Sequence, residues 1–121
     1  YDVRFAYLYR ALAKAGAGIL TVPAAFSPVT GQAHWEPLLR ARAIETGCYV
    51  LAPAQTGEHP ARQGKLRKTF GHSLVVSPWG EVLADGGTEP GTVFVELDME
   101  QVAQARQKIA ALRHDRKFEG P

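Results

Sequence analysis

The chain is poor in cysteine, since only Cys48 among its 121 residues carries a thiol. A single cysteine cannot form an internal disulfide, so the sequence lacks the framework of small secreted domains and favours a reducing, cytoplasmic location. Cys48 begins an apolar run over residues 48–52 that is typical of a buried strand. A cysteine in such a run usually serves packing, and we expect no catalytic role for it.

Long hydrophobic runs and clustered histidines are also missing. No apolar run approaches the roughly 20 residues that a membrane-spanning helix needs, so we expect no contact with a membrane. The four histidines are scattered along the chain without the close spacing of metal ligands. The sequence therefore does not support a metal site.

Charge of one sign is not strongly in excess, because the formal net charge is only +2. A nucleic-acid-binding protein typically carries a denser basic stripe with stacking aromatic residues. The sequence predicts instead a solvated loop and a solvated C-terminal end, without a nucleic-acid partner. Two basic groups occupy these segments, namely Arg62, Lys65, Arg67 and Lys68, and Arg113, Arg116 and Lys117.

What the sequence does contain is an alternation of helical and strand patterns. Apolar spacing predicts helices over residues 4–15, 34–46 and 99–111, with Asp98 as N-cap of the last one. Pro37 fits the second helix only in its first turn. Apolar or alternating runs predict strands over residues 19–22, 48–54, 71–77, 81–84 and 92–97. We expect loops at 24–31 and 55–69, a turn at 78–80 and an exposed arm at 112–121.

This order predicts an α/β fold with a mixed sheet. The two early strands alternate with helices and should pair in parallel, whereas the later strands should be antiparallel neighbours. The early strands are apolar throughout, as in sheets covered on both faces. Since three helices cannot cover both faces, we expect a second sheet, from a longer protein or another copy, to cover one of them.

Four motifs follow one another in an order that resembles the nitrilase (carbon–nitrogen hydrolase) superfamily. The first is Tyr1-Asp2-Val3-Arg4-Phe5, ahead of a helix. The others are the segments 23–26 with 30–35, 39–45, and 71–84 with Pro78-Trp79-Gly80. Together they cover nearly the whole chain, and within the superfamily they are most similar to nitrilase-like amidases.

The resemblance implies that Tyr1 directly follows the nucleophilic cysteine of an amide-cleaving enzyme. Residues 1–121 would then be the C-terminal portion of a single carbon–nitrogen hydrolase domain, whose fold is a four-layer αββα sandwich. The family's Glu, Lys and Cys side chains would all lie before Tyr1. The implied reaction is hydrolysis of small linear amides, deaminated glutathione or a related ω-amide, through a cysteine thioester and without a cofactor.

The resemblance also implies roles for residues of this chain. The backbone N–H of Tyr1 would contribute to the oxyanion hole, beside the start of a helix. Substrate-binding positions would be Ala25, Phe26, Thr30 and Gln55.

Other matched residues are expected to be structural. We expect Asp2 and Arg4 to form a local ion pair. His34 and Trp35 should pack a helix start, and His72 should be a structural histidine. We expect a salt bridge between Arg42 and Glu45, on a helix that the family uses in a two-fold dimer, so a homodimer or larger homo-oligomer is implied.

Two alternatives compete with this interpretation. The chain could belong to a nitrilase-like assembly or binding module without catalysis. The helix–strand alternation alone would also fit a flavodoxin-like nucleotide binder, but no Gly-x-Gly-x-x-Gly loop follows a strand.

Overall fold

The computed structural model of the chain describes residues 1–60, 64, 66–117 and 119–120. Three α-helices, six strands and two short 3₁₀ helices follow one another in these residues. In chain order they are η1 (Asp2–Arg4), α1 (Ala6–Lys14), β1 (Ile19–Thr21), α2 (Pro28–Thr46), β2 (Tyr49–Ala52), β3 (Thr56–His59), β4 (Arg67–Phe70), β5 (Leu74–Val76), β6 (Val82–Asp85), α3 (Glu100–Lys108) and η2 (Ala111–Arg113).

The main sheet is mixed, as the sequence predicts. Its strand order is β1-β2-β5-β6, with β1 and β2 parallel and the remaining pairs antiparallel. A parallel bridge between Ala24 and Ala54 continues the β1–β2 pairing beyond the strand ends. The segments that follow β1 and β2 are therefore held side by side at one end of the sheet.

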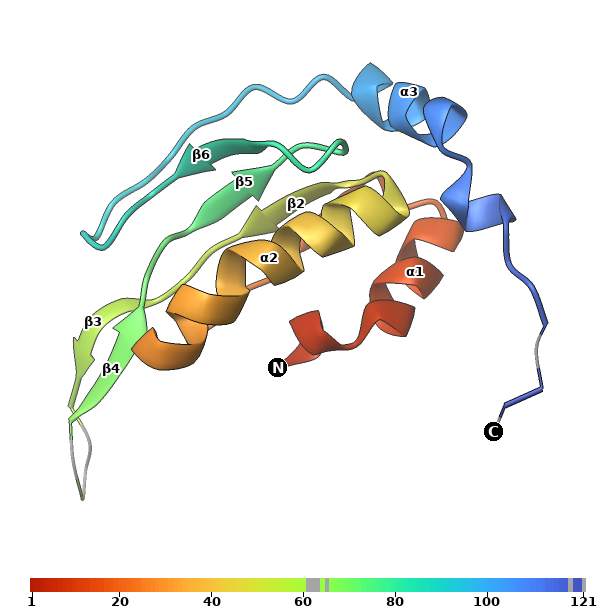
Figure 1. Ribbon diagram of the computed structural model, residues 1–121. Coiled ribbons are helices and arrows are strands. Elements are labelled where there is room, and N and C mark those ends of the chain that lie inside the picture. Colours follow the sequence, from red (N-terminus) through yellow and green to blue (C-terminus); the bar gives the residue numbers. More distant parts are fainter. Residues whose placement is uncertain (61–63, 65, 118, 121) are drawn as a thin grey trace.

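The helices α1 and α2 cover one face of this sheet (Figure 1). Residues of the sheet that face these helices, such as Leu20, Val50 and Val76, are at most 2% exposed. Burying one such side chain contributes about 1.5–3 kcal/mol. On the opposite face Ile19 is 38% exposed, so β1 is not buried on both faces within this chain. Coverage of that face by a second sheet stays a prediction.

The helix α2 begins at Pro28, whereas the sequence predicts a start at His34. Ser27 is its N-cap, and the Ser27 side chain accepts a hydrogen bond from the Thr30 N–H. The prediction was wrong because Gly31 is a helical residue and not a loop breaker. A Cβ atom on Gly31 would overlap the side chain of Phe70, so glycine permits close packing of α2 on β4. Pro37 consequently lies inside the helix and not in its first turn.

The predicted surface loop over residues 55–69 is largely a β-hairpin. The strands β3 and β4 pair in antiparallel register from Thr56 with Phe70 to His59 with Arg67. Its polar, charged strands lack the apolar alternation that identifies a half-buried strand, which is why the sequence pattern indicated a loop. Arg62 and Lys65 of the basic group lie outside the described residues.

The strand predicted over residues 92–97 does not form in the described chain. This segment runs beside β6 in Figure 1, but it has no ladder pairing with any described strand. Phe94 is 90% exposed and Val93 is 42% exposed, whereas Val95 and Leu97 are partly buried.

The predicted third helix forms as α3, but its N-cap is one residue later than predicted. Asp98 accepts a hydrogen bond from the Glu100 N–H at 2.9 Å, while Met99 occupies the N-cap position.

Part of the C-terminal arm predicted over residues 112–121 is held against α1. Asp115 forms ion pairs with Arg10 and Lys14 of α1, and Arg10 also donates to the carbonyl of Ala111 at 2.8 Å. Within the described residues, none of the helices has the length and hydrophobicity needed to cross a membrane.

Candidate functional site

Tyr1 lies at the end of the main sheet where β1 finishes. It lines a cleft of about 70 Å³ together with residues that follow β1, among them Pro23, Ala24 and Phe26. Ligand pockets usually enclose about 300–1,000 Å³, so this cleft is only a part of a site. Its place, at the carboxyl end of a parallel strand, is where α/β sheets bind ligands.

The turn that carries Tyr1 is not the start of a continuous helix. The predicted helix over residues 4–15 is divided into η1 and α1 by Phe5, whose φ of −99° and ψ of 82° are not helical. A single 3₁₀ turn has little dipole, so the helix dipole at Tyr1 is weaker than the sequence suggests. The Tyr1 carbonyl accepts a hydrogen bond from the Arg4 N–H at 3.1 Å, whereas the first N–H groups of a helical turn have no partner within the turn.

A buried arginine fixes this turn. Arg42 of α2 is 6% exposed, and its Nε donates to the carbonyl of Val3 at 2.8 Å. Its NH1 donates to Glu45 at 2.7 Å, which confirms the predicted salt bridge. The guanidinium also lies over the Tyr9 ring. Arg42 therefore joins α2, α1 and η1 within one chain.

Arg4 does not pair with Asp2, so the predicted local ion pair was wrong for these described residues. Its guanidinium carbon lies 5.4 Å from the centre of the Tyr1 ring and 5.5 Å from that of Phe26. Its NH2 lies 3.2 Å from Nδ1 of His34, which is exposed and does not pack the helix start as predicted. Arg4 is thus a half-buried cation between two aromatic rings of the candidate site.

The segment that carries Ala25 and Phe26 is held by its backbone. The Phe70 N–H donates to the Phe26 carbonyl at 2.9 Å, so β4 attaches to the site. The Gln55 N–H donates to the Ala24 carbonyl at 2.9 Å, and the Gln55 carbonyl accepts from Gly71. Gln55 follows β2, and Ala24 follows β1. Their hydrogen bond therefore brings Gln55 close to the segment that carries Ala25 and Phe26.

Phe26 packs on Trp35, and hydrogen bonds connect Trp35 to His72 and His72 to Asp85. The ring centres of Phe26 and Trp35 are 5.0 Å apart, and Trp35 is 1% exposed, as the packing prediction requires. The indole Nε1 donates to the carbonyl of His72 at 2.6 Å. His72 has a φ of +57°, rare for a residue with a side chain, and its Nδ1 lies 2.9 Å from Asp85.

Asp85 is ionised more readily than an ordinary aspartate. Partial burial alone would raise its pKa, but the hydrogen bonds from His72 and from the Gly87 N–H outweigh burial and lower the pKa. The carboxylate therefore anchors the His72 ring, while the His72 N–H donates to the Gly87 carbonyl at 2.7 Å. His72 acts as the structural histidine that the sequence predicts.

The remaining predicted residue, Thr30, lies in the first turn of α2. Its hydroxyl is 2.7 Å from that of Ser27, so it takes part in the helix cap. A role for Thr30 in substrate binding stays a prediction, as do the roles of Tyr1, Ala25, Phe26 and Gln55.

Cys48 lies away from the candidate site. It is fully buried, donates from Sγ to the Ala17 carbonyl at 3.2 Å and accepts from Arg106 at 3.1 Å. These contacts are those of a packing residue. Within the described part of the chain, His, Cys, Asp and Glu side chains nowhere gather in groups of three that could hold a metal ion.

Comparison with known proteins identifies the family. Residues 1–107 match the sequence profile described as carbon–nitrogen hydrolase. The chain belongs to the carbon–nitrogen hydrolase family. It is 51% identical over 114 residues to a deaminated glutathione amidase of Synechocystis sp., covering 94% of this chain and 40% of that protein. The chain thus spans well under half the length of this relative.

Solved structures of the family have the same fold. The C. elegans NitFhit protein superposes with a TM-score of 0.88 at 46% identity, over 96% of this chain and 27% of that one. An amidase from Nesterenkonia sp. AN1 gives a TM-score of 0.65 at 34% identity, over 89% of this chain and 39% of that one. The nitrilase-like α/β fold predicted from the sequence is therefore confirmed.

The sequence interpretation missed two cations at this site. Arg4 was assigned to a local ion pair, and Arg67 was assigned to a solvated loop. Both stand in motifs that the sequence does mark, the opening segment and the first basic group. Their orientation could not be found because it depends on how η1 and the β3–β4 hairpin pack against Phe26 and Ala25.

Proposed function

We propose that residues 1–121 are the C-terminal portion of one carbon–nitrogen hydrolase domain that cleaves amide bonds of small linear molecules. In this proposal the nucleophilic cysteine directly precedes Tyr1. The observation that carries it is the place of Tyr1, in a partial cleft where β1 ends. Support also comes from the Nesterenkonia amidase, whose structure has an acetamide moiety added covalently at the active-site cysteine.

The reaction follows from these positions. The cysteine sulfur attacks the amide carbon, and the carbonyl oxygen becomes an oxyanion that accepts a hydrogen bond from the Tyr1 N–H. The C–N bond then breaks, and the amine leaves with a proton delivered by a general acid. A water molecule hydrolyses the resulting thioester, releasing the acid and the thiol. The glutamate and lysine that assist these steps in the family would lie before Tyr1.

The substrate class follows from the cation and rings at the site. Arg4 is close to Tyr1 and presents a guanidinium, the group best suited to bind a carboxylate with two hydrogen bonds. An amide whose acyl half ends in a carboxylate would therefore be held with its carbonyl near the nucleophile, against Phe26. Deaminated glutathione and related ω-amides have this chemistry, and the similar amidase from Synechocystis sp. bears the name of the first.

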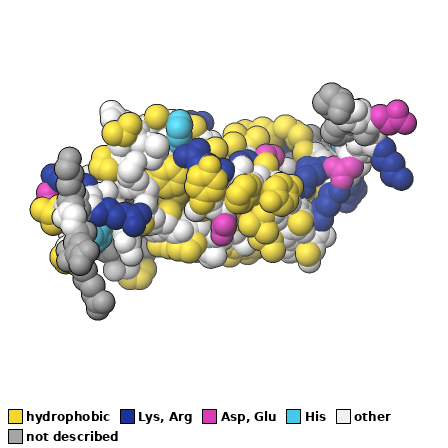
Figure 2. All heavy atoms as spheres, turned by 90° about the horizontal axis from the view of Figure 1, so that it is seen from below, with side chains coloured by type: hydrophobic (Ala, Val, Ile, Leu, Met, Phe, Trp, Pro, Cys, Tyr) yellow, Lys and Arg dark blue, Asp and Glu magenta, His cyan; other side chains and the backbone are white. Residues whose placement is uncertain are grey.

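We further propose that the protein acts as a cytoplasmic homodimer or larger homo-oligomer. Hydrophobic side chains gather on the side where η1 and α1 lie (Figure 2). Tyr1, Tyr7 and Leu12 of these elements are 84%, 74% and 44% exposed. Exposed apolar patches of this kind usually mark interaction sites. The similarity to amidases favours the enzyme over an assembly module without catalysis.

The test uses the full-length protein that contains this chain. It should release cysteinylglycine from deaminated glutathione or ammonia from 2-oxoglutaramate, and alanine at the residue before Tyr1 should abolish both reactions. The isolated 121-residue chain should hydrolyse neither, because it lacks the nucleophile and the base. A folded full-length protein that hydrolyses no small amide, or an active isolated chain, would contradict the proposal.

A further inference from the structure

The β3–β4 hairpin places a second arginine beside the candidate site. Arg67 begins β4, and its NH2 donates to the carbonyl of Ala25 at 3.4 Å. The same strand attaches to the site through Phe70 and Phe26. Arg67 is therefore positioned by the backbone that positions the site, although it belongs to a segment that the sequence marks only as basic and polar.

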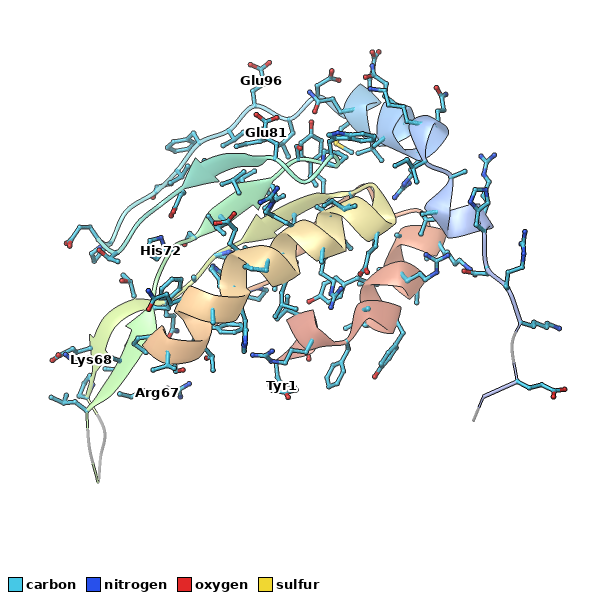
Figure 3. All side chains as sticks on the ribbon, viewed as in Figure 1. Tyr1, Arg67, Lys68, His72, Glu81 and Glu96 are labelled. Carbon is cyan, nitrogen blue, oxygen red and sulfur yellow. The ribbon has the colours of Figure 1, made fainter. Side chains whose placement is uncertain are left out.

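The neighbouring lysine has a different environment. Arg67 and Lys68 are successive strand residues, so their side chains leave opposite faces of the hairpin. Lys68 pairs with Glu58 across the hairpin, with Nζ 2.6 Å from the carboxylate. Figure 3 shows Arg67 directed to the side on which Tyr1 lies and Lys68 directed away from it. Among the described residues, no carboxylate pairs with Arg67.

Arg67 and Arg4 both contact the Ala25–Phe26 segment. Arg4 stacks near the Phe26 ring, whereas Arg67 contacts the preceding Ala25 carbonyl. A guanidinium has five N–H donors, and the single long bond of Arg67 leaves most of them free. Two cations along one wall suit a substrate with a carboxylate on each side of the scissile amide.

We propose that Arg67 determines specificity by binding the carboxylate at the far end of the leaving amine, a role that rests on the proposed function. Arg4, which follows Tyr1 closely, takes the carboxylate of the acyl half. Arg67, farther from Tyr1 along this wall, takes the terminal carboxylate of a peptide-like amine such as cysteinylglycine. The site is thereby selective for amides of small carboxylate-terminated peptides over amides that release ammonia.

The test compares two substrates that differ in this carboxylate alone. They are deaminated glutathione and its C-terminal glycinamide form, each assayed with full-length protein for kcat/KM. Wild-type protein should prefer the carboxylate form by about 10- to 100-fold, the usual effect of one hydrogen-bonded charge. In Arg67→Gln this preference should nearly vanish, and Arg67→Lys should retain part of it.

Lys68→Gln is the matched control, because it removes the same charge from the adjacent residue. Its preference for the carboxylate form should equal that of wild type. The proposal is wrong if Arg67→Gln keeps the wild-type preference, or if Lys68→Gln loses it equally. It is also wrong if Arg67→Gln lowers kcat/KM equally for deaminated glutathione, its glycinamide form and 2-oxoglutaramate. Arg67 would then bind the acyl half of the substrate or stabilise the hairpin. A wild-type protein inactive on all three amides overturns the proposed function itself.

Discussion

The guanidinium of Arg42 donates a 2.8 Å hydrogen bond to the carbonyl of Val3, and it does so from a buried position on α2. Val3 is 2% exposed and belongs to the turn η1 that follows Tyr1. The position of Tyr1 at the candidate site is thus set by a side chain from another helix. The described contacts of Arg42, with Val3, Glu45 and Tyr9, all lie within one chain.

Replacing Arg42 should therefore destabilise the fold. In Arg42→Met the Val3 carbonyl and Glu45 lose their donor, and such a loss at a buried site costs about 3 kcal/mol. Glu45→Gln is the control, because Glu45 is partly exposed and its charge should contribute less than about 1 kcal/mol. Urea unfolding of the full-length variants measures both values. If both variants lost the same free energy of unfolding, the hydrogen bond to the Val3 carbonyl would contribute no stability beyond that of the salt bridge.

Asp85 should make stability depend on pH in the acid range. Its pKa is lowered in the folded protein, so its ionised form stabilises the fold above the pKa of the unfolded chain, about 3.9. This contribution is lost as pH falls through the lower folded pKa. The gap in unfolding free energy between wild type and Asp85→Asn should therefore narrow as the pH falls below about pH 4.

His72→Asn provides the second arm of that experiment, since asparagine tolerates the positive φ of His72. Its effect should overlap with that of Asp85→Asn, so that the double variant is less destabilised than the sum of the two single variants. A stability gap that stays unchanged down to pH 3 would rule out the proposed role of the Asp85 carboxylate.

Gly31→Ala should destabilise the protein, although alanine normally favours a helix. The added Cβ overlaps Phe70, and overpacking of this kind costs about 1–3 kcal/mol. Shortening Phe70 to alanine in the same protein should relieve the overlap, so the second substitution should cost less in Gly31→Ala than in wild type. Thermal unfolding of the four proteins measures this coupling. A stabilised Gly31→Ala would mean that α2 and β4 do not pack this closely.

Cys48→Ala should leave turnover nearly unchanged and lower stability by about 1–2 kcal/mol, because the thiol is buried and hydrogen-bonded far from the site. Enzyme assays and denaturation of the full-length variant separate the two effects. A loss of turnover above about 100-fold in a folded variant would identify Cys48 as the nucleophile.

The sequence predicts the main sheet better than it predicts the site. The apolar runs of β1 and β2, and the Pro78-Trp79-Gly80 turn, have strong local signals, and their pairing is confirmed. Gly31 was predicted to lie in a loop, but it is a helical residue. Its close contact with Phe70 is a tertiary feature that no local sequence pattern records. The hairpin of β3 and β4 was missed for another reason, because its polar strands lack apolar alternation.

The site itself depends on contacts between distant segments. Tyr1 and Phe26 were expected together and share one cleft. Arg4 and Arg67 reach the same region only through tertiary packing. From the sequence, Arg4 was predicted to pair with Asp2, and Arg67 was predicted to lie in a solvated loop. Long polar side chains have many rotamers, and sequence spacing does not determine where their ends lie.

The most direct test of the account is to locate the acyl group on the enzyme. Full-length protein is mixed with deaminated glutathione, quenched in acid within the first turnover and digested for mass spectrometry. The account predicts a 2-oxoglutaryl thioester on a cysteine immediately before Tyr1, and an unmodified Cys48. An acyl group on Cys48, or a residue other than cysteine before Tyr1, would contradict it.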